Sequence, residues 1–215
     1  MRRQVFIVWF VIFLVWAFYR AYFSLPEAID ELLIKPLIFV LPILIIVFVK
    51  EKKKLSDLHV FPSRKDFFLD LYIGVVIGVL FALEGLVVNY LKYGQFSFSP
   101  LFSVKAGGGI IGFFIINLFT SLWEEILGRG YLYQRLYRET NNQMQSAIVS
   151  SFLFLLLHIP IMFTRLQLVG TSLLIYPLSI LILGVTNCYL LTLRKSLTLP
   201  ILIHTFWNMT VALYL

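Results

Sequence analysis

The sequence has little charge. Only 13% of its 215 residues are Asp, Glu, Lys or Arg, whereas 60% are hydrophobic, and the mean hydropathy is +0.91. Water-soluble domains contain about 25% charged residues and roughly half apolar residues. This composition excludes an ordinary soluble domain. It predicts an integral, multi-pass membrane protein whose length suits one domain, residues 1–215.

Several motifs are also missing. Cys188 is the single cysteine, so an intrachain disulfide is excluded. The chain has no H-E-x-x-H zinc helix, no Gly-x-Gly-Asp in an apolar segment and no membrane serine in a Gly-x-Ser-x-Gly context. These absences disfavour the hydrolytic mechanisms that depend on those motifs. No internal repeat is visible either, which disfavours a proton-coupled transporter using Glu84 and Glu124.

The apolar runs predict an all-α transmembrane bundle of about seven spans, with eight as the alternative count and a catalytic cavity inside the bundle. Residues 1–106 supply the N-terminal spans and residues 107–215 the catalytic core. We expect Pro36 and Pro42 to kink or break the second span, and Gly74 and Gly78 to allow a close helix approach. The expected spans are Val5–Phe23, Ile34–Val49, Phe67–Leu91, a helix from Gly107 through the motif below, Ser146–Phe163, Leu168–Leu193 and Leu197 to the C-terminus.

Two connections and one amphipathic stretch complete this prediction. Glu27, Asp30 and Glu31 form an acidic connection between the first two spans. His59 is expected to be a solvated residue of a polar loop. The stretch Tyr131–Gln145 is expected to be polar and amphipathic. Within the third span, Glu84 either hydrogen-bonds to a neighbouring helix or lines a cavity.

The net charge of +7 comes from basic residues clustered at the ends of the spans. This distribution indicates membrane orientation and a lipid bilayer as partner, not nucleic-acid binding. With a cytoplasmic N-terminus and seven spans, twelve basic residues lie inside and five outside, as the positive-inside rule requires. The inner set is Arg2, Arg3, Lys50, Lys52, Lys53, Lys54, Arg64, Lys65, Arg135, Arg138, Arg194 and Lys195, and the outer set is Arg20, Lys35, Lys92, Lys105 and Arg165.

The stretch 121–131, SLWEEILGRGY, places two carboxylates and a guanidinium in an apolar run. A charge in mid-membrane costs about 2.5 to 3.5 kcal/mol on insertion scales, so such groups are paired, face a cavity or do chemistry. Glu125 and Arg129 are four residues apart and can pair on one helical face. Glu124 points about 100° away. The next residue on its face, Gly128, has no side chain, so Glu124 is expected to have empty space beside it.

Other rare polar residues lie at the same depth as Glu124. At ~1.5 Å per residue, His158, His204 and Asn208 fall with it in one narrow band of the bilayer. A carboxylate, two imidazoles and an amide suit a hydrolase, with Glu124 as general base, one imidazole holding the water, and His204 with Asn208 binding an oxyanion. Phe154 is one turn from His158 and can fix its ring. In the alternative interpretation, these groups only hydrogen-bond the helices together.

Three motifs at these residues resemble the CPBP family, the CAAX-protease and bacteriocin-processing membrane proteins also called Abi. They are E-E-x-x-x-R, F-x-x-x-H and H-x-x-x-N, read here as Glu124-Glu125-Ile-Leu-Gly-Arg129, Phe154-Leu-Leu-Leu-His158 and His204-Thr-Phe-Trp-Asn208. Gly130, Gly184 and Pro200 are also similar to the family, whereas Gly128 stands where a bulky residue is usual. The resemblance covers about Leu118–Leu215.

The resemblance implies an intramembrane endopeptidase similar to type II CAAX prenyl proteases. Its substrate would be a polypeptide at or in the membrane, with or without a lipid anchor. Glu124 and His158 would activate water, and His204 and Asn208 would form the oxyanion site. Glu125 and Arg129 would be structural or substrate-orienting. The alternative is a non-catalytic membrane scaffold or a bacteriocin self-immunity protein.

The family has been described both as metalloproteases and as metal-independent glutamate proteases. No metal is favoured here, because His204 shares a helical face with Asn208, a poor zinc ligand but a good oxyanion donor. If zinc were bound, Glu124, His158 and His204 would be its ligands.

Overall fold

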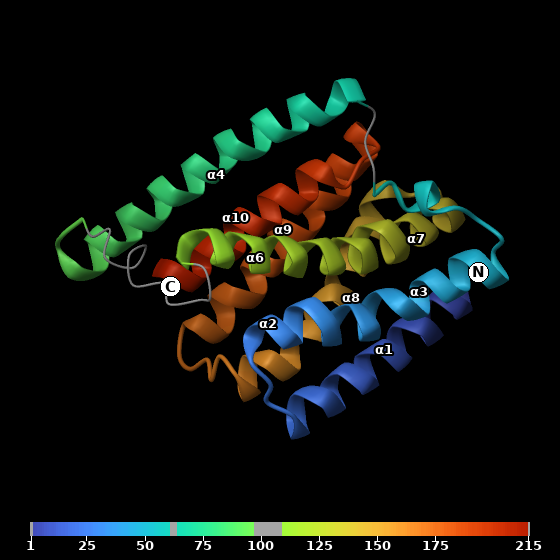
Figure 1. Ribbon diagram of the computed structural model, residues 1–215, viewed down its shortest axis with the longest axis horizontal. Helices are drawn as coiled ribbons and strands as arrows, with labels where there is room; N and C mark the ends of the chain where they lie inside the picture. Colours follow the sequence, from blue (N-terminus) through green and yellow to red (C-terminus); the bar gives the residue numbers. More distant parts are fainter. Residues whose placement is uncertain (1, 61–63, 97–108, 215) are drawn as a thin grey trace.

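The computed structural model describes residues 2–60, 64–96 and 109–214, and its elements there are all helical (Figure 1). This confirms the predicted all-α membrane bundle. Six helical stretches are long and apolar enough to cross a membrane, close to the predicted seven, and the predicted last span corresponds to α10 (Thr198–Tyr214), a helix of 17 residues. The six are Arg3–Tyr22, Glu27–Lys50, Asp66–Leu91, Gly109–Thr140, Gln143–Thr164 and Ser172–Arg194. The predicted boundary between the N-terminal spans and the catalytic core, at residues 106–107, lies outside the described residues.

The second span follows α1 (Arg2–Tyr22) and is helical from Glu27 to Lys50. It begins before the predicted Ile34, so the predicted acidic connection is wrong. Its segments are α2 (Glu27–Ile29), η1 (Asp30–Ile34), η2 (Pro36–Val40), α3 (Leu41–Ile45) and η3 (Ile46–Lys50), where η1, η2 and η3 have the wider π-helical turn. The acidic residues can enter the helix because Asp30 pairs with Arg20 at 2.8 Å and Glu31 pairs with Lys35.

Helix α10 packs against both α4 (Arg64–Tyr93) and α6 (Gly109–Glu125). Two glycines of α4 allow this contact, as predicted. A Cβ atom on Gly74 would lie 2.7 Å from the Leu202 side chain, and one on Gly78 would lie 2.6 Å from the Phe206 ring. Helix α8 (Gln143–Thr164) packs against α1, against α9 (Ser172–Arg194) and against η5 (Ile126–Tyr133), the segment that continues α6.

Helix α6 continues without a break into the π-helical η5 (Ile126–Tyr133) and α7 (Gln134–Thr140). The predicted amphipathic stretch is therefore wrong for residues 131–136, which are buried. Arg135 can be buried there because its guanidinium lies 2.7 Å from Glu51 and 4.2 Å from the centre of the Tyr131 ring. Burial opposes ionisation of Glu51, but the hydrogen bonds and charge of Arg135 outweigh it and keep the pKa of Glu51 below its ordinary value.

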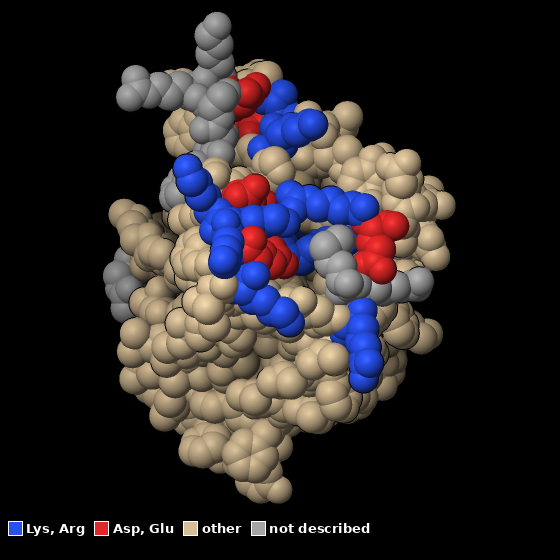
Figure 2. Space-filling view, turned by 90° about the vertical axis from the view of Figure 1, so that its right-hand side faces the viewer, with Lys and Arg blue, Asp and Glu red and all other residues tan. Residues whose placement is uncertain are grey.

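Lysines and arginines gather on the end of the molecule that carries the N-terminus (Figure 2). His59 lies in a loop, as predicted, and is partly buried there. Its carbonyl accepts a hydrogen bond from the Leu197 amide at 2.8 Å, and its Nδ1 lies 3.1 Å from the Lys195 carbonyl. Burial lowers the pKa of His59. The loop thus ties the second span to the turn between α9 and α10.

Candidate active site

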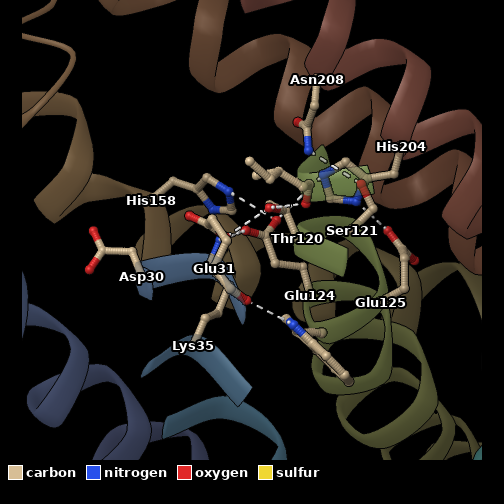
Figure 3. A network of polar contacts seen from close by, with 12 residues as sticks. Asp30, Glu31, Lys35, Thr120, Ser121, Glu124, Glu125, His158, His204 and Asn208 are labelled. Atoms are coloured by element: carbon tan, nitrogen blue, oxygen red, sulfur yellow. Dashed lines mark hydrogen bonds and ion pairs between the residues drawn. The ribbon is translucent and has the colours of Figure 1, made fainter. Parts of the chain in front are cut away.

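Glu124, near the end of α6, is buried at the meeting point of four spans, and Lys35, His158 and His204 point toward it (Figure 3). Its Oε1 lies 2.8 Å from the Lys35 ammonium group. Its Oε2 lies 3.5 Å from His158 Nε2 on α8 and 3.4 Å from His204 Nε2 on α10. The structure therefore brings together three of the four residues predicted to be catalytic.

Both imidazole rings are fixed through their Nδ1 atoms. His158 Nδ1 lies 2.9 Å from the Phe154 carbonyl, and the Phe154 ring packs edge-on at 4.6 Å between ring centres. His204 Nδ1 lies 2.8 Å from Glu125 Oε1. Because a carbonyl and a carboxylate only accept hydrogen bonds, each Nδ1 carries the proton. Both Nε2 atoms are then directed at the same oxygen of Glu124.

Glu125 organises the layer behind this contact and is fully buried. Besides His204, its Oε1 binds the Arg129 guanidinium at 2.9 Å and accepts a hydrogen bond from Asn187 at 2.9 Å. The predicted Glu125–Arg129 pair is thus confirmed. Arg129 also stacks over the Phe154 ring at 4.5 Å. Glu125 therefore holds the His204 ring from behind, while Glu124 faces it from the front.

The space predicted beside Gly128 is bordered by Phe154. Gly128 is buried, and a Cβ atom there would lie 3.4 Å from the Phe154 ring. The fourth predicted catalytic residue, Asn208, donates its side-chain amide to the Ser121 hydroxyl at 3.3 Å. Asn208 lies one turn after His204 on α10, and Ser121 lies one turn before Glu124 on α6, so this contact is at the edge of the cluster.

Sequence reasoning missed a second acidic–basic pair in the site. Lys35 was assigned to the outer loops, yet it is buried between Glu31 and Glu124. Glu31 is fixed by α6, because Thr120 donates to its carboxylate at 2.8 Å and Trp123 donates to its carbonyl at 2.9 Å. The available signal was the four-residue spacing of Glu31 and Lys35 beside an apolar run, the same spacing that revealed Glu125 and Arg129.

The fixed charges of the cluster leave room for one proton. Three carboxylates, on Glu31, Glu124 and Glu125, face two permanent cations, Lys35 and Arg129. With both imidazoles neutral, the net charge of these five groups is −1. One added proton on an imidazole brings this net charge to zero, and a neutral cluster is favoured because an unbalanced charge is costly in a membrane. A carboxylate beside a protonated imidazole is a pair suited to acid–base catalysis.

A metal fits this arrangement only in part. Two imidazoles with bonded Nδ1 atoms and a carboxylate are donor types that zinc accepts. However, the Lys35 ammonium group is bonded to the carboxylate that would have to bind the ion. Within residues 2–60, 64–96 and 109–214, no group of three or more His, Cys, Asp or Glu side chains is arranged to hold a metal ion. A metal held by both Nε2 atoms would therefore have to bind Oε2, the oxygen of Glu124 that Lys35 leaves free.

Glu84 lies apart from this cluster. It is exposed on α4 and lines a hollow of about 70 Å³ with residues of α10, among them Trp207 and Tyr214. Of the two roles predicted for Glu84, it therefore lines a small hollow, which belongs to the α4–α10 surface.

The fold and these contacts define a multi-pass helical membrane protein with a buried glutamate–histidine site. Residues 106–210 match the family model described as type II CAAX prenyl endopeptidase Rce1-like. This match agrees with the resemblance to the CPBP family of CAAX-protease-like membrane proteins that the three motifs indicated. No curated protein and no solved structure matches the chain. The match contains Glu124, His158, His204 and Asn208, and Lys35 lies outside it.

Proposed function

We propose that this protein is an intramembrane endopeptidase that hydrolyses a peptide bond of a polypeptide at or in the membrane, with or without a lipid anchor. The observation that supports it most is the direction of two imidazole Nε2 atoms at one oxygen of a buried glutamate, at 3.4 and 3.5 Å. The family match supports a CAAX-protease-like activity. Fixed donors and acceptors around one buried carboxylate are what water activation requires.

In the proposed reaction, the additional proton that neutralises the cluster is on His204. Its Nδ1 proton binds Glu125, so a second proton, on Nε2, is needed to donate to an oxyanion. Glu125 stabilises the resulting imidazolium charge. His158 stays neutral, and its Nε2 lone pair accepts a hydrogen bond from the attacking water while Glu124 removes a proton from that water. The water oxygen bonds to the peptide carbonyl carbon, and the carbonyl oxygen becomes an oxyanion bound by His204 and Asn208. The oxyanion then re-forms a C=O bond as the C–N bond breaks, and Glu124 gives its proton to the departing amine nitrogen, which leaves a new carboxyl group on the substrate.

The test is a cleavage assay in lipid nanodiscs, read by mass spectrometry. Substrates are membrane-anchored peptides with and without a C-terminal prenyl group. We expect wild-type protein to cleave and Glu124→Gln to lose roughly 10²- to 10⁴-fold in rate, the usual contribution of a general base. Glu84→Gln is the matched control, because it changes an exposed carboxylate away from the cluster. Cleavage by Glu124→Gln at the wild-type rate would contradict the proposal.

A second candidate is a non-catalytic scaffold or self-immunity protein. Its supporting observation is that Lys35, His158 and His204 join Glu124 to three other spans, which a packing role would also require. In that case folded wild-type protein cleaves none of the peptides.

We also propose that the N-terminus is cytoplasmic. The N-terminal end of the bundle carries the basic face in Figure 2, and Lys35, counted outside by sequence, is buried in the site. Removing it from the outer set leaves four basic residues there against twelve inside, which strengthens the positive-inside asymmetry.

A further inference from the structure

Lys35 is a lysine buried in the second span, outside the residues that match the family model. Its ammonium group contacts Glu31 and lies 2.8 Å from Glu124 Oε1. On another side it lies 5.7 Å from the centre of the Trp16 ring, so an aromatic face also holds the cation. The ammonium position is therefore fixed by three neighbours from three helices.

A purely structural lysine would not need Glu124. Glu31 and Lys35 already form a neutral pair one helical turn apart, which satisfies both charges inside the membrane. The bond to Glu124 is additional, and it joins the second span to the residue that carries the proposed chemistry. Glu31 is also oriented by Thr120 of α6, at 2.8 Å, so the pair is held in register with Glu124.

The bond from Lys35 makes the two oxygens of Glu124 unequal. Oε1 is occupied by the ammonium group, and Oε2 faces both imidazoles. Rotation of the carboxylate about its last bond would exchange these contacts, and Lys35 opposes that rotation. The lysine also places a positive charge at the carboxylate in a region where few donors are available.

We propose that Lys35 is a positioning residue for Glu124, that Glu31 positions Lys35 in turn, and that the second span therefore completes the active site. This inference rests on the proposed peptidase function for its kinetic consequences. The contact between Lys35 and Glu124 can be tested without any activity.

The first test is a double-mutant cycle on thermal unfolding in detergent, with Lys35→Met, Glu124→Gln and the double variant. We expect Lys35→Met to lower the unfolding midpoint of the wild-type protein. In Glu124→Gln protein the same substitution should lower the midpoint by no more than half that amount, because the two residues share one interaction. Additive shifts would overturn the proposal. If Lys35→Met does not fold, the cycle is run in Glu31→Gln protein, where the lysine's other carboxylate is neutral.

The second test measures kcat and KM of folded variants. We expect Lys35→Met in the Glu31→Gln background to lose about 10²-fold in kcat, the cost of misplacing a catalytic group by about 1 Å, with KM changed less than about threefold. Lys35→Arg should recover part of the loss because it keeps the charge. Lys50→Met, an exposed lysine at the end of the same span, is the control and should behave as wild type.

The two tests separate the possible failures. Unchanged kcat in a folded Lys35 variant overturns the positioning role while the peptidase stands. Coupled stability together with an inactive wild type refutes the proposed function and with it the catalytic role of Lys35, and leaves only the contact between Lys35 and Glu124.

Discussion

Replacing Glu125 by glutamine keeps the size of the side chain and removes only its charge. The carboxylate is fully buried and is bonded through one oxygen to Arg129, Asn187 and His204. A glutamine carbonyl in the same place can still accept the hydrogen bonds of Asn187 and His204. What changes is that Arg129, itself 1% exposed, loses its counter-ion inside the bundle.

The expected loss of stability follows from that unpaired guanidinium. Removing one partner of a buried ion pair costs about 3 to 5 kcal/mol. For a chain of this size, each kcal/mol lowers the unfolding midpoint by roughly 2 to 4 °C. Glu125→Gln should therefore lower the midpoint by roughly 6 to 20 °C.

Glu124→Gln is the matched control. It makes the same chemical change at the adjacent residue, but Lys35 keeps Glu31 as its partner. We expect a smaller shift in the midpoint. Unfolding in detergent is followed by tryptophan fluorescence and by the fraction of monodisperse protein on size-exclusion chromatography. Glu125→Gln combined with Arg129→Met should recover part of the loss, because a buried ion pair can be replaced by neutral groups at little cost.

Two results would refute this reasoning. One is a Glu125→Gln protein as stable as wild type. The other is an inactive, stable Glu125→Gln protein beside an active Glu124→Gln protein, which would exchange the roles assigned to the two glutamates.

Three further predictions concern other parts of the molecule. Because the folded-state pKa of Glu51 is lowered, its pair with Arg135 stabilises the protein above the ordinary carboxyl pKa of 4.5, and this stability is lost as the pH falls below that value. Glu51→Gln should therefore lower the unfolding midpoint by at most roughly 4 °C at neutral pH and should not change it at low pH. A difference between the two proteins that stays constant with pH would contradict this. Gly78→Ala places a methyl group against the Phe206 ring and should cost about 1 to 3 kcal/mol in thermal unfolding, so an unchanged midpoint would show that α4 and α10 are not in close contact. Prolonged chelation should leave cleavage unchanged, whereas stoichiometric zinc whose removal abolishes activity and whose return restores it would make His204 a ligand.

Topology has its own test. A reporter that is active only in the cytoplasm, fused to the C-terminus, should give no signal if the N-terminus is inside and the chain crosses seven times. A strong signal would mean an even number of spans.

The sequence was sufficient for the class of fold and for the Glu125–Arg129 pair. Both depend on neighbours along the chain: hydrophobic runs long enough to cross a bilayer, and two charges one helical turn apart. It also identified His158 and His204 as residues at the depth of Glu124, because rise along a helix converts residue number into depth. Depth does not give direction, so their shared orientation toward one oxygen of Glu124 became visible only in the structure.

The errors came from groups whose surroundings are supplied by distant segments. Glu31 and Lys35 looked like loop residues because charge at the end of an apolar run usually marks a membrane boundary. In the folded chain, Thr120 and Glu124 of α6 provide the partners that let both be buried. The sequence also did not reveal that the Phe154 ring, from α8, borders the space beside Gly128.

The sequence by itself thus determined that this protein lies in a membrane as a helical bundle and which three motifs are candidates for its chemistry, because burial of apolar surface and the spacing of motifs are properties of local sequence. Only the tertiary structure decided which cation faces Glu124, which of its oxygens meets the imidazoles, and which carboxylate holds His204 from behind. These contacts join residues up to 89 positions apart. Their geometry is set by how α6, α8, α10 and the second span pack together, which no local pattern specifies.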